Sequence, residues 1–185
     1  MRVTIRHHFD FGAERAIVGD DLVRPESWDA LRMQTSGPFA AASSREELER
    51  TAEELQEIEA RGAAIDRWLE QNRVGVLASY GVGGGVLEWW LERLCPERRL
   101  LLAEYAPETV DRLRQLFPGA DVQRHDLLSD PPLVANAHLF HRVDTELTNA
   151  EWHETMWRFA GERVLVVVAE VATPKRLLQE LREKS

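Results

Sequence analysis

Short apolar runs alternate with segments of helical periodicity between residues 74 and 171, and this alternation restricts the fold more than any other feature of the chain. Strands that alternate with helices form βαβ units, whose right-handed crossovers give a parallel sheet covered on both faces. We therefore expect an α/β fold with a doubly wound, mostly parallel sheet and the first strand at its centre. The expected strands are 74–80, 99–105, 120–126, 135–143 and 163–171, and the expected helices between and after them are 85–95, 107–117, 149–160 and 174–184.

The rest of the chain adds an N-terminal segment to this α/β unit. Residues 1–43 read as an extension of loops and short turns, with one β-rich stretch at 3–11. A long helix is expected from Ser44, with Gly62 as the place where it breaks or bends. We assign residues 44–185 to a single α/β domain, since 185 residues suffice for one core but not comfortably for two.

Composition narrows the classes of partner. The net charge is −9 and basic residues are interleaved with acidic ones, which argues against nucleic acid. No apolar window has the length of a membrane span, and the N-terminus lacks a signal-peptide core, so a cytoplasmic protein is expected. No metal site is expected, because the adjacent His7 and His8 point to opposite faces of a strand. The one cysteine, Cys95, is read as a packing residue.

Glycines cluster where the first expected strand gives way to a helix. Gly81, Gly83 and Gly85 form a G-x-G-x-G pattern, whereas the dinucleotide fingerprint G-x-G-x-x-G would need glycine at the position of Val86. Each glycine in an ordered element costs roughly 0.5–1 kcal/mol relative to alanine. The loop therefore either turns as other residues cannot or is approached closely by a ligand.

Carboxylates follow at the ends of the next two strands. Ligands of doubly wound sheets bind at the carboxyl ends of the strands, near the switch point of the topology. Glu104 ends the second strand, where a carboxylate can accept hydrogen bonds from both hydroxyls of a ribose. Asp126 ends the third strand and can accept from the exocyclic amine of an adenine. These three strand ends favour a nucleoside-containing ligand.

In these stretches the chain resembles the class I S-adenosylmethionine (SAM)-dependent methyltransferases. The residues "VLASYGVGGG" look like motif I of that family, "LLLAEYAPETVDRLR" like its acidic motif II, and "ADVQRHDLLSD" like the motif that ends its third strand. The resemblance implies SAM as cofactor, S-adenosylhomocysteine (SAH) as product and a small molecule as methyl acceptor. The cofactor-binding residues that it implies are Ser79, Gly81, Gly83, Gly85, Glu104, Tyr105, Asp126 and Leu127.

Two departures from the family pattern stand out. The family usually carries an acidic residue two positions before the first glycine, where this chain has Ser79. The family fold also ends in two further strands, which this sequence does not provide after 163–171. An apolar strand left at the sheet edge is an aggregation hazard. We expect the edge to be covered by residues 3–11 or by a second copy of the chain in a homodimer or a larger complex.

For catalysis, the sequence offers two histidines near the end of the fourth strand. Methyl transfer chiefly needs alignment of acceptor and methyl group, and a base helps when the acceptor carries a proton. His141 and His138 are the candidate bases, His141 lying nearer the strand end. The alternative for each is a polar residue that lines or caps the strand.

Two other functions stay open. One is a degenerate protein of the same fold that serves as a binding or interaction subunit without methyl transfer, which Ser79 and the missing strands favour. The other is a nicotinamide-cofactor binder, against which Val86 argues. The pocket for the acceptor is expected to be built from residues 1–43 and 127–150.

Overall fold

The computed structural model describes residues 24–34, 40–143, 147 and 149–167. Within these ranges five parallel strands form one sheet in the order β3-β2-β1-β4-β5, with β1 in the centre. This confirms the expected doubly wound α/β fold. The strands are β1 (Val76–Tyr80), β2 (Arg99–Glu104), β3 (Asp121–Arg124), β4 (Ala137–His141) and β5 (Val164–Val167).

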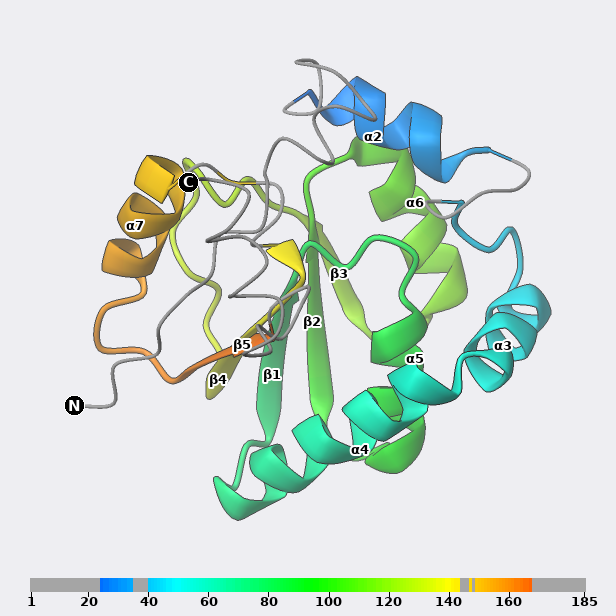
Figure 1. Cartoon of the computed structure of the whole chain (residues 1–185), viewed down its shortest axis with the longest axis horizontal. Helices are drawn as coiled ribbons and strands as arrows, with labels where there is room; N and C mark the ends of the chain where they lie inside the picture. Colours follow the sequence, from blue (N-terminus) through cyan, green and yellow to red (C-terminus); the bar gives the residue numbers. More distant parts are fainter. Residues whose placement is uncertain (1–23, 35–39, 144–146, 148, 168–185) are drawn as a thin grey trace, which may run out of the picture.

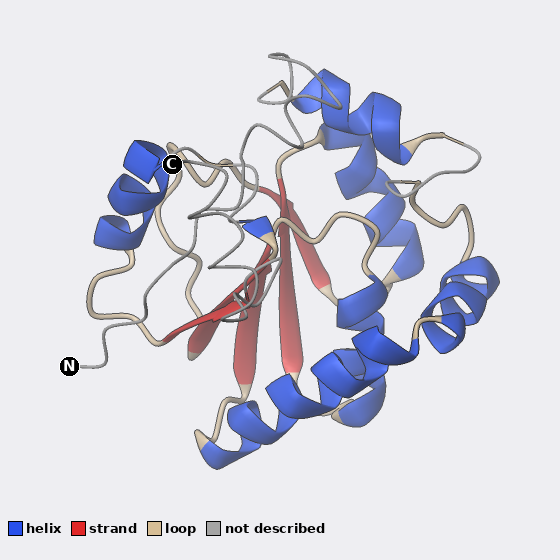
Figure 2. Ribbon diagram, viewed as in Figure 1, coloured by secondary structure: helices blue, strands red, loops and turns tan. Residues whose placement is uncertain are grey.

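Helices cover both faces of the sheet (Figures 1 and 2). Most of them pack against one core, whereas α7 lies on the other face, as expected when β1–β2–β3 and β4–β5 are wound in opposite directions from the centre. The helices are α2 (Pro25–Arg32), α3 (Arg45–Glu54), α4 (Gln56–Gln71), α5 (Val86–Leu94), α6 (Pro107–Leu116) and α7 (Asn149–Arg158).

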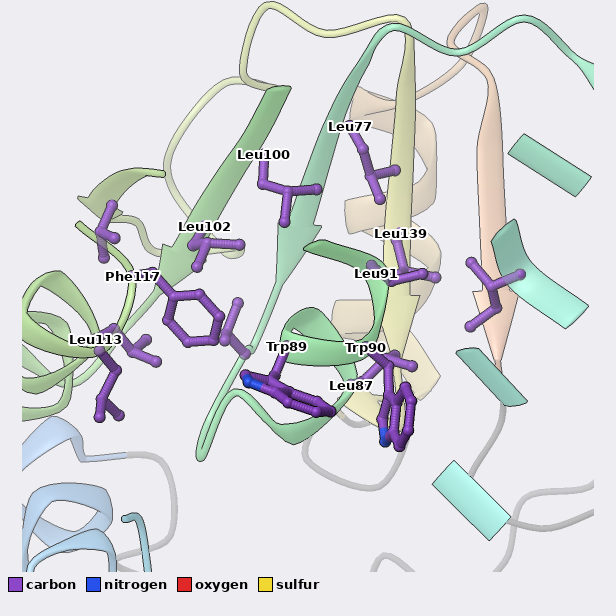
Figure 3. Close-up of a cluster of buried hydrophobic side chains, with 14 of the residues drawn as sticks. Leu77, Leu87, Trp89, Trp90, Leu91, Leu100, Leu102, Leu113, Phe117 and Leu139 are labelled. Carbon is purple, nitrogen blue, oxygen red and sulfur yellow. The ribbon is translucent and has the colours of Figure 1, made fainter. Parts of the chain in front are cut away.

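Side chains of β1 alternate between these two faces. Leu77 belongs to the larger core, which also contains leucines of β2 and β4 and residues of α3, α4, α5 and α6. Figure 3 shows this cluster, with Trp89 and Trp90 of α5 among its members. Ala78 and Tyr80 belong to the second cluster, which packs against α7. A strand buried on both faces reads as a continuous apolar run, which is why β1 was recognisable from sequence.

The long helix expected from Ser44 is two helices. The break falls at Leu55, between α3 and α4, and not at Gly62. Gly62 lies inside α4, where an added Cβ would come 3.0 Å from Cβ of Trp90. The glycine is thus explained by close packing of α4 on α5, and the expectation of a break there is wrong.

Helix α2 belongs to the segment that sequence analysis assigned to an N-terminal extension. Its buried Asp29 accepts hydrogen bonds from the backbone N–H groups of Glu108 (3.0 Å) and Thr109 (2.8 Å) and from the Thr109 hydroxyl (2.9 Å). These N–H groups belong to the first turn of α6, which has no partner for them within the helix. Asp29 therefore fixes α2 over the N-terminus of α6, at the upper edge of the sheet in Figure 1.

Two expectations fall outside the described residues. Residues 3–11, one candidate cover for the sheet edge, are not described, and neither is the helix expected at 174–184. How the edge of β5 is covered stays a prediction. No helix among the described residues is long and apolar enough to cross a membrane.

Candidate functional site

A pocket that opens to solvent lies at the carboxyl edge of the sheet. Five residues that the sequence pointed to line it together: Gly81, Glu104, Tyr105, Asp126 and Leu127. They lie at or just after the ends of β1, β2 and β3, so the parallel arrangement brings three separate strand ends to one place. The other predicted cofactor residues, Ser79, Gly83 and Gly85, do not line this pocket.

Glu104 joins the end of β2 to the glycine loop. Its Oε2 accepts a hydrogen bond from the backbone N–H of Gly83 (2.7 Å), and its Oε1 accepts from the N–H groups of Tyr105 (2.7 Å) and Ala106 (3.4 Å). A carboxylate has about four lone-pair sites, so these donors leave one acceptor position on Oε2. Glu104 thus holds the loop in place and still offers an oxygen to the pocket.

The glycine loop adopts a conformation that other residues enter only at a cost. The φ angles of Gly81, Gly83 and Gly85 are +65°, +59° and +76°, all in the left-handed region. At Gly85, the N-cap of α5, an added Cβ would come 2.6 Å from the ring of Phe117. Gly85 is therefore required by the packing of α5 on the chain after α6, independently of any ligand.

Ser79 is buried beneath this loop and has a carboxyl group as its partner. Its hydroxyl donates a 2.6 Å hydrogen bond to Oε1 of Glu88, which lies in the first turn of α5. Burial, with a smaller contribution from the nearby Glu104, raises the pKa of Glu88 to about 7, although the hydrogen bond from the Ser79 hydroxyl opposes this shift. An acidic group thus lies next to position 79, supplied by the helix instead of the strand.

Asp126 organises the turn after β3. Its Oδ1 accepts from the N–H of Leu128 (2.8 Å) and its Oδ2 from the hydroxyl of Ser129 (3.0 Å). The neighbouring Leu127 is held through its carbonyl, which accepts from side chains of α7. The pocket wall after β3 is therefore a hydrogen-bonded turn and not a loose loop.

Several pocket residues were not singled out by the sequence. Trp28 comes from α2, His125 and Tyr80 come from the strand ends, and Glu151 comes from α7. His125 is buried, and its Nε2 has no hydrogen-bond partner among the described residues. Burial lowers its pKa. His125 precedes Asp126 directly, so its place at a strand end was the one signal that could have identified it.

His138 lies away from the pocket, in the aromatic cluster on the α7 side of the sheet. It is fully buried, its Nδ1 is 3.1 Å from the Tyr80 hydroxyl, and its Nε2 is 3.5 Å from Oε2 of Glu162. Its ring packs edge-on against Phe159, with centroids 5.1 Å apart. Burial lowers its pKa. These contacts account for His138 as a packing residue within the sheet.

His141 ends β4 on the opposite face and does not line the pocket either. Its Nε2 lies 2.9 Å from a guanidinium nitrogen of Arg61, which can only donate, so the ring accepts and is neutral. Burial, Arg61 and Arg142 together lower the pKa of His141 to about 3. The two histidines are thus on different faces, as their odd spacing in a strand requires.

No group of three or more potential metal ligands occurs among the described residues. His7 and His8 lie outside them.

The fold is similar to solved structures of methyltransferases. Human N-acetylserotonin methyltransferase matches 75% of this chain and 43% of its own, with a TM-score of 0.55 and 21% identity. The mitomycin 7-O-methyltransferase MmcR aligns with 91% of this chain over 62% of its own length, with a TM-score of 0.53 and 16% sequence identity. The plantazolicin methyltransferase BpumL aligns with 88% of this chain over 70% of its own length, with a TM-score of 0.53 and 12% sequence identity. The chain thus has the fold of the class I SAM-dependent methyltransferases.

These similarities are structural. No protein-family profile matches the sequence, and no curated protein does. The chain spans about two fifths of the N-acetylserotonin methyltransferase and about three fifths of MmcR.

Proposed function

We propose that the chain binds SAM in the pocket at the carboxyl edge of the sheet and transfers its methyl group to a small-molecule acceptor. The observation that carries this proposal is the meeting of Gly81, Glu104 and Asp126, from three strand ends, in one pocket. The sequence predicts that Glu104 accepts from the ribose hydroxyls and that Asp126 accepts from the adenine of such a ligand. The solved structures with this fold include proteins described as bound to SAM or SAH.

The polar groups of the pocket fit such a cofactor. Glu104 keeps an acceptor position for ribose hydroxyls, which are donors. Next to Asp126, the buried Nε2 of His125 has no partner among the described residues, and buried nitrogens of this kind normally have one. We infer that a nitrogen-rich base such as adenine lies between Tyr105, His125 and Asp126.

SAM supplies a methyl group on a sulfonium that is already a good leaving group. The protein then has to hold the acceptor in line with that methyl group and exclude water. With a pKa of about 3, His141 is a weak base at neutral pH, and His138 is enclosed among aromatic rings. We therefore propose that transfer depends on alignment in the pocket and on an intrinsically reactive acceptor, and not on these histidines.

Backbone amide NMR of the labelled protein tests where the ligand binds. Addition of SAH should shift the amide signals of Gly81, Tyr105 and Leu127 and leave those of α3 unchanged. Saturable binding that perturbs other regions instead would remove the pocket assignment. Binding in the pocket without methyl transfer to any small-molecule acceptor would favour the interaction-subunit alternative.

A further inference from the structure

The carboxyl end of β4 brings two arginines and a histidine together outside the pocket. Nη1 of Arg61, from α4, lies 2.9 Å from Nε2 of His141, and Arg142 is the next residue of the chain. Besides burial, both guanidinium groups lower the pKa of His141, so both positive charges lie close to its ring. Two cations thus meet at this strand end around a neutral imidazole.

The hydrogen-bond partner of Arg61 leaves its charge uncompensated. Among the described residues Arg61 forms no ion pair, whereas Arg45 and Arg98 are each bound to a carboxylate. Arg61 is half-buried, so its charge is partly removed from water. A cation in such a place is stabilised when an anion joins it, and a second arginine beside it strengthens that preference.

Arg142 has a backbone conformation that is rare for a residue with a long side chain. Its φ is +61°, in the left-handed region, which costs roughly 1–2 kcal/mol for a residue with a Cβ. Its N–H donates to the carbonyl of Val167 (2.8 Å), which fixes the turn beside β5. Glycine would form this turn more easily. An arginine held there indicates a use for the side chain, because strained residues cluster at functional sites.

The cluster lies beside the pocket, away from the end that is assigned to the nucleoside. Val143, two residues after His141, lines the pocket, and a Cβ built on Gly81 would come 2.7 Å from its Cγ2. Tyr105 and Asp126 follow β2 and β3, and β1 lies between β2 and β4 in the sheet. The two arginines are therefore on the other side of the glycine loop from the nucleoside end.

We propose that Arg61 and Arg142 bind an oxyanion, such as a carboxylate, that is carried by the methyl acceptor. The planar donors of a guanidinium match the oxygens of a carboxylate or a phosphate. The carboxylates that line the pocket, of Glu104, Asp126 and Glu151, repel such a group. The oxyanion should therefore point to the arginines and leave the reacting group of the acceptor in the pocket. That the ligand is a methyl acceptor rests on the proposed function.

Backbone amide NMR of the labelled protein, with and without saturating SAH, tests this site. Benzoate is the probe, and benzamide, which has a similar shape without the charge, is the ligand control. Benzoate should shift the amide signals of His141 and Arg142 in a saturable way, and benzamide should bind roughly tenfold more weakly or not at all. Inorganic phosphate in the same titration distinguishes the sources of the oxyanion: tighter binding of phosphate identifies a phosphorylated ligand, and tighter binding of benzoate an organic acid.

Variants of α4 separate recognition of the charge from a role in folding. Arg61→Met should weaken benzoate binding roughly tenfold, whereas Arg61→Lys keeps the positive charge and should retain part of the affinity. Arg67→Met removes an exposed arginine of the same helix and should leave the affinity unchanged. Urea denaturation shows whether each variant is folded. Equal binding of benzoate and benzamide, or equal binding of benzoate by the parent and by folded Arg61→Met, would overturn the proposal.

The oxyanion site and the proposed function fail separately. If SAH shifts the signals of the pocket while neither benzoate nor phosphate shifts those of His141 and Arg142, the oxyanion site is refuted and SAM binding stands. If benzoate binds at His141 and Arg142 but SAH does not bind, the proposed function fails, and the assignment of the oxyanion to a methyl acceptor is refuted with it.

Discussion

Ser79 and Glu88 form a 2.6 Å hydrogen bond beneath the glycine loop, and this pair makes stability depend on pH. The pKa of Glu88 is raised to about 7 in the folded protein, above its ordinary value of 4.5. The carboxyl thus favours folding while it is protonated, and this contribution is lost as the pH rises from about 4.5 through about 7. The unfolding free energy falls by at most about 3 kcal/mol over this pH range as a result of the Glu88 shift.

Glu88→Gln should remove that dependence. The amide oxygen still accepts from Ser79, and no buried charge forms at high pH. Urea denaturation at pH 5 and pH 8 should show the variant more stable than the parent at pH 8, with the difference shrinking toward pH 5. The exposed Glu57→Gln is the matched control. A parent and variant with parallel pH profiles would show that Glu88 titrates normally.

Glu104→Ala should weaken SAH binding by ~1.5–3 kcal/mol, the usual contribution of a hydrogen bond to a charged group. It also leaves the N–H groups of Gly83 and Tyr105 without an acceptor, so stability should fall as well. Glu104→Gln keeps one acceptor oxygen and should show a smaller loss. Calorimetry on folded variants measures both effects, and unchanged affinity in Glu104→Ala would refute the assignment of this residue.

Gly85 and Gly84 provide a matched pair in the loop. Gly85→Ala places a Cβ 2.6 Å from Phe117 in a left-handed backbone, and we expect it to cost ~2 kcal/mol or more of unfolding free energy. Gly84 has no positive φ, and its Cβ would meet only Cα of Ala41 at 3.9 Å, so Gly84→Ala should change stability by less than about 1 kcal/mol. Chemical denaturation measures the unfolding free energy of both variants. An equal loss of unfolding free energy in the two would contradict the explanation of Gly85 by packing.

Asp29 tests the attachment of α2. Asp29→Ala removes the acceptor for the first turn of α6 and should lower stability by roughly 1–2 kcal/mol. Limited proteolysis should then cut within residues 24–34 before the rest of the domain unfolds. Glu26→Ala, on the same helix, is the control. If both variants resist the protease as well as the parent, contacts other than Asp29 hold α2.

The fold was predictable because its strands are buried on both faces. The runs around β1 and β2 are nearly continuous apolar stretches, and α6 after β2 begins with a clear signal, Pro107. The break at Leu55 was missed because no proline or glycine marks it. Gly62 suggested a break where packing on Trp90 was the reason for glycine.

The site residues were predictable only where they lie at the end of a strand that the sequence itself indicates. Glu104 is the last residue of β2 and Asp126 lies two residues after β3, so the parallel sheet brings them together. Trp28 and Arg32 were missed because α2 is placed by contacts between positions far apart in the chain, of Asp29 with α6 and of Arg32 with the glycine loop. Glu88 was missed because its role comes from its contact with Ser79, and that contact depends on how α5 packs on β1, which no local sequence pattern shows.

The central claim is that the pocket beside Gly81 and Glu104 binds SAM and not a dinucleotide. Isothermal titration of the purified protein with SAM, SAH and NAD tests it most directly. We predict saturable one-to-one binding of SAM and SAH in the micromolar range and no measurable heat with NAD. Binding of NAD in the same range, or no binding of SAM and SAH by the folded protein, would contradict the account.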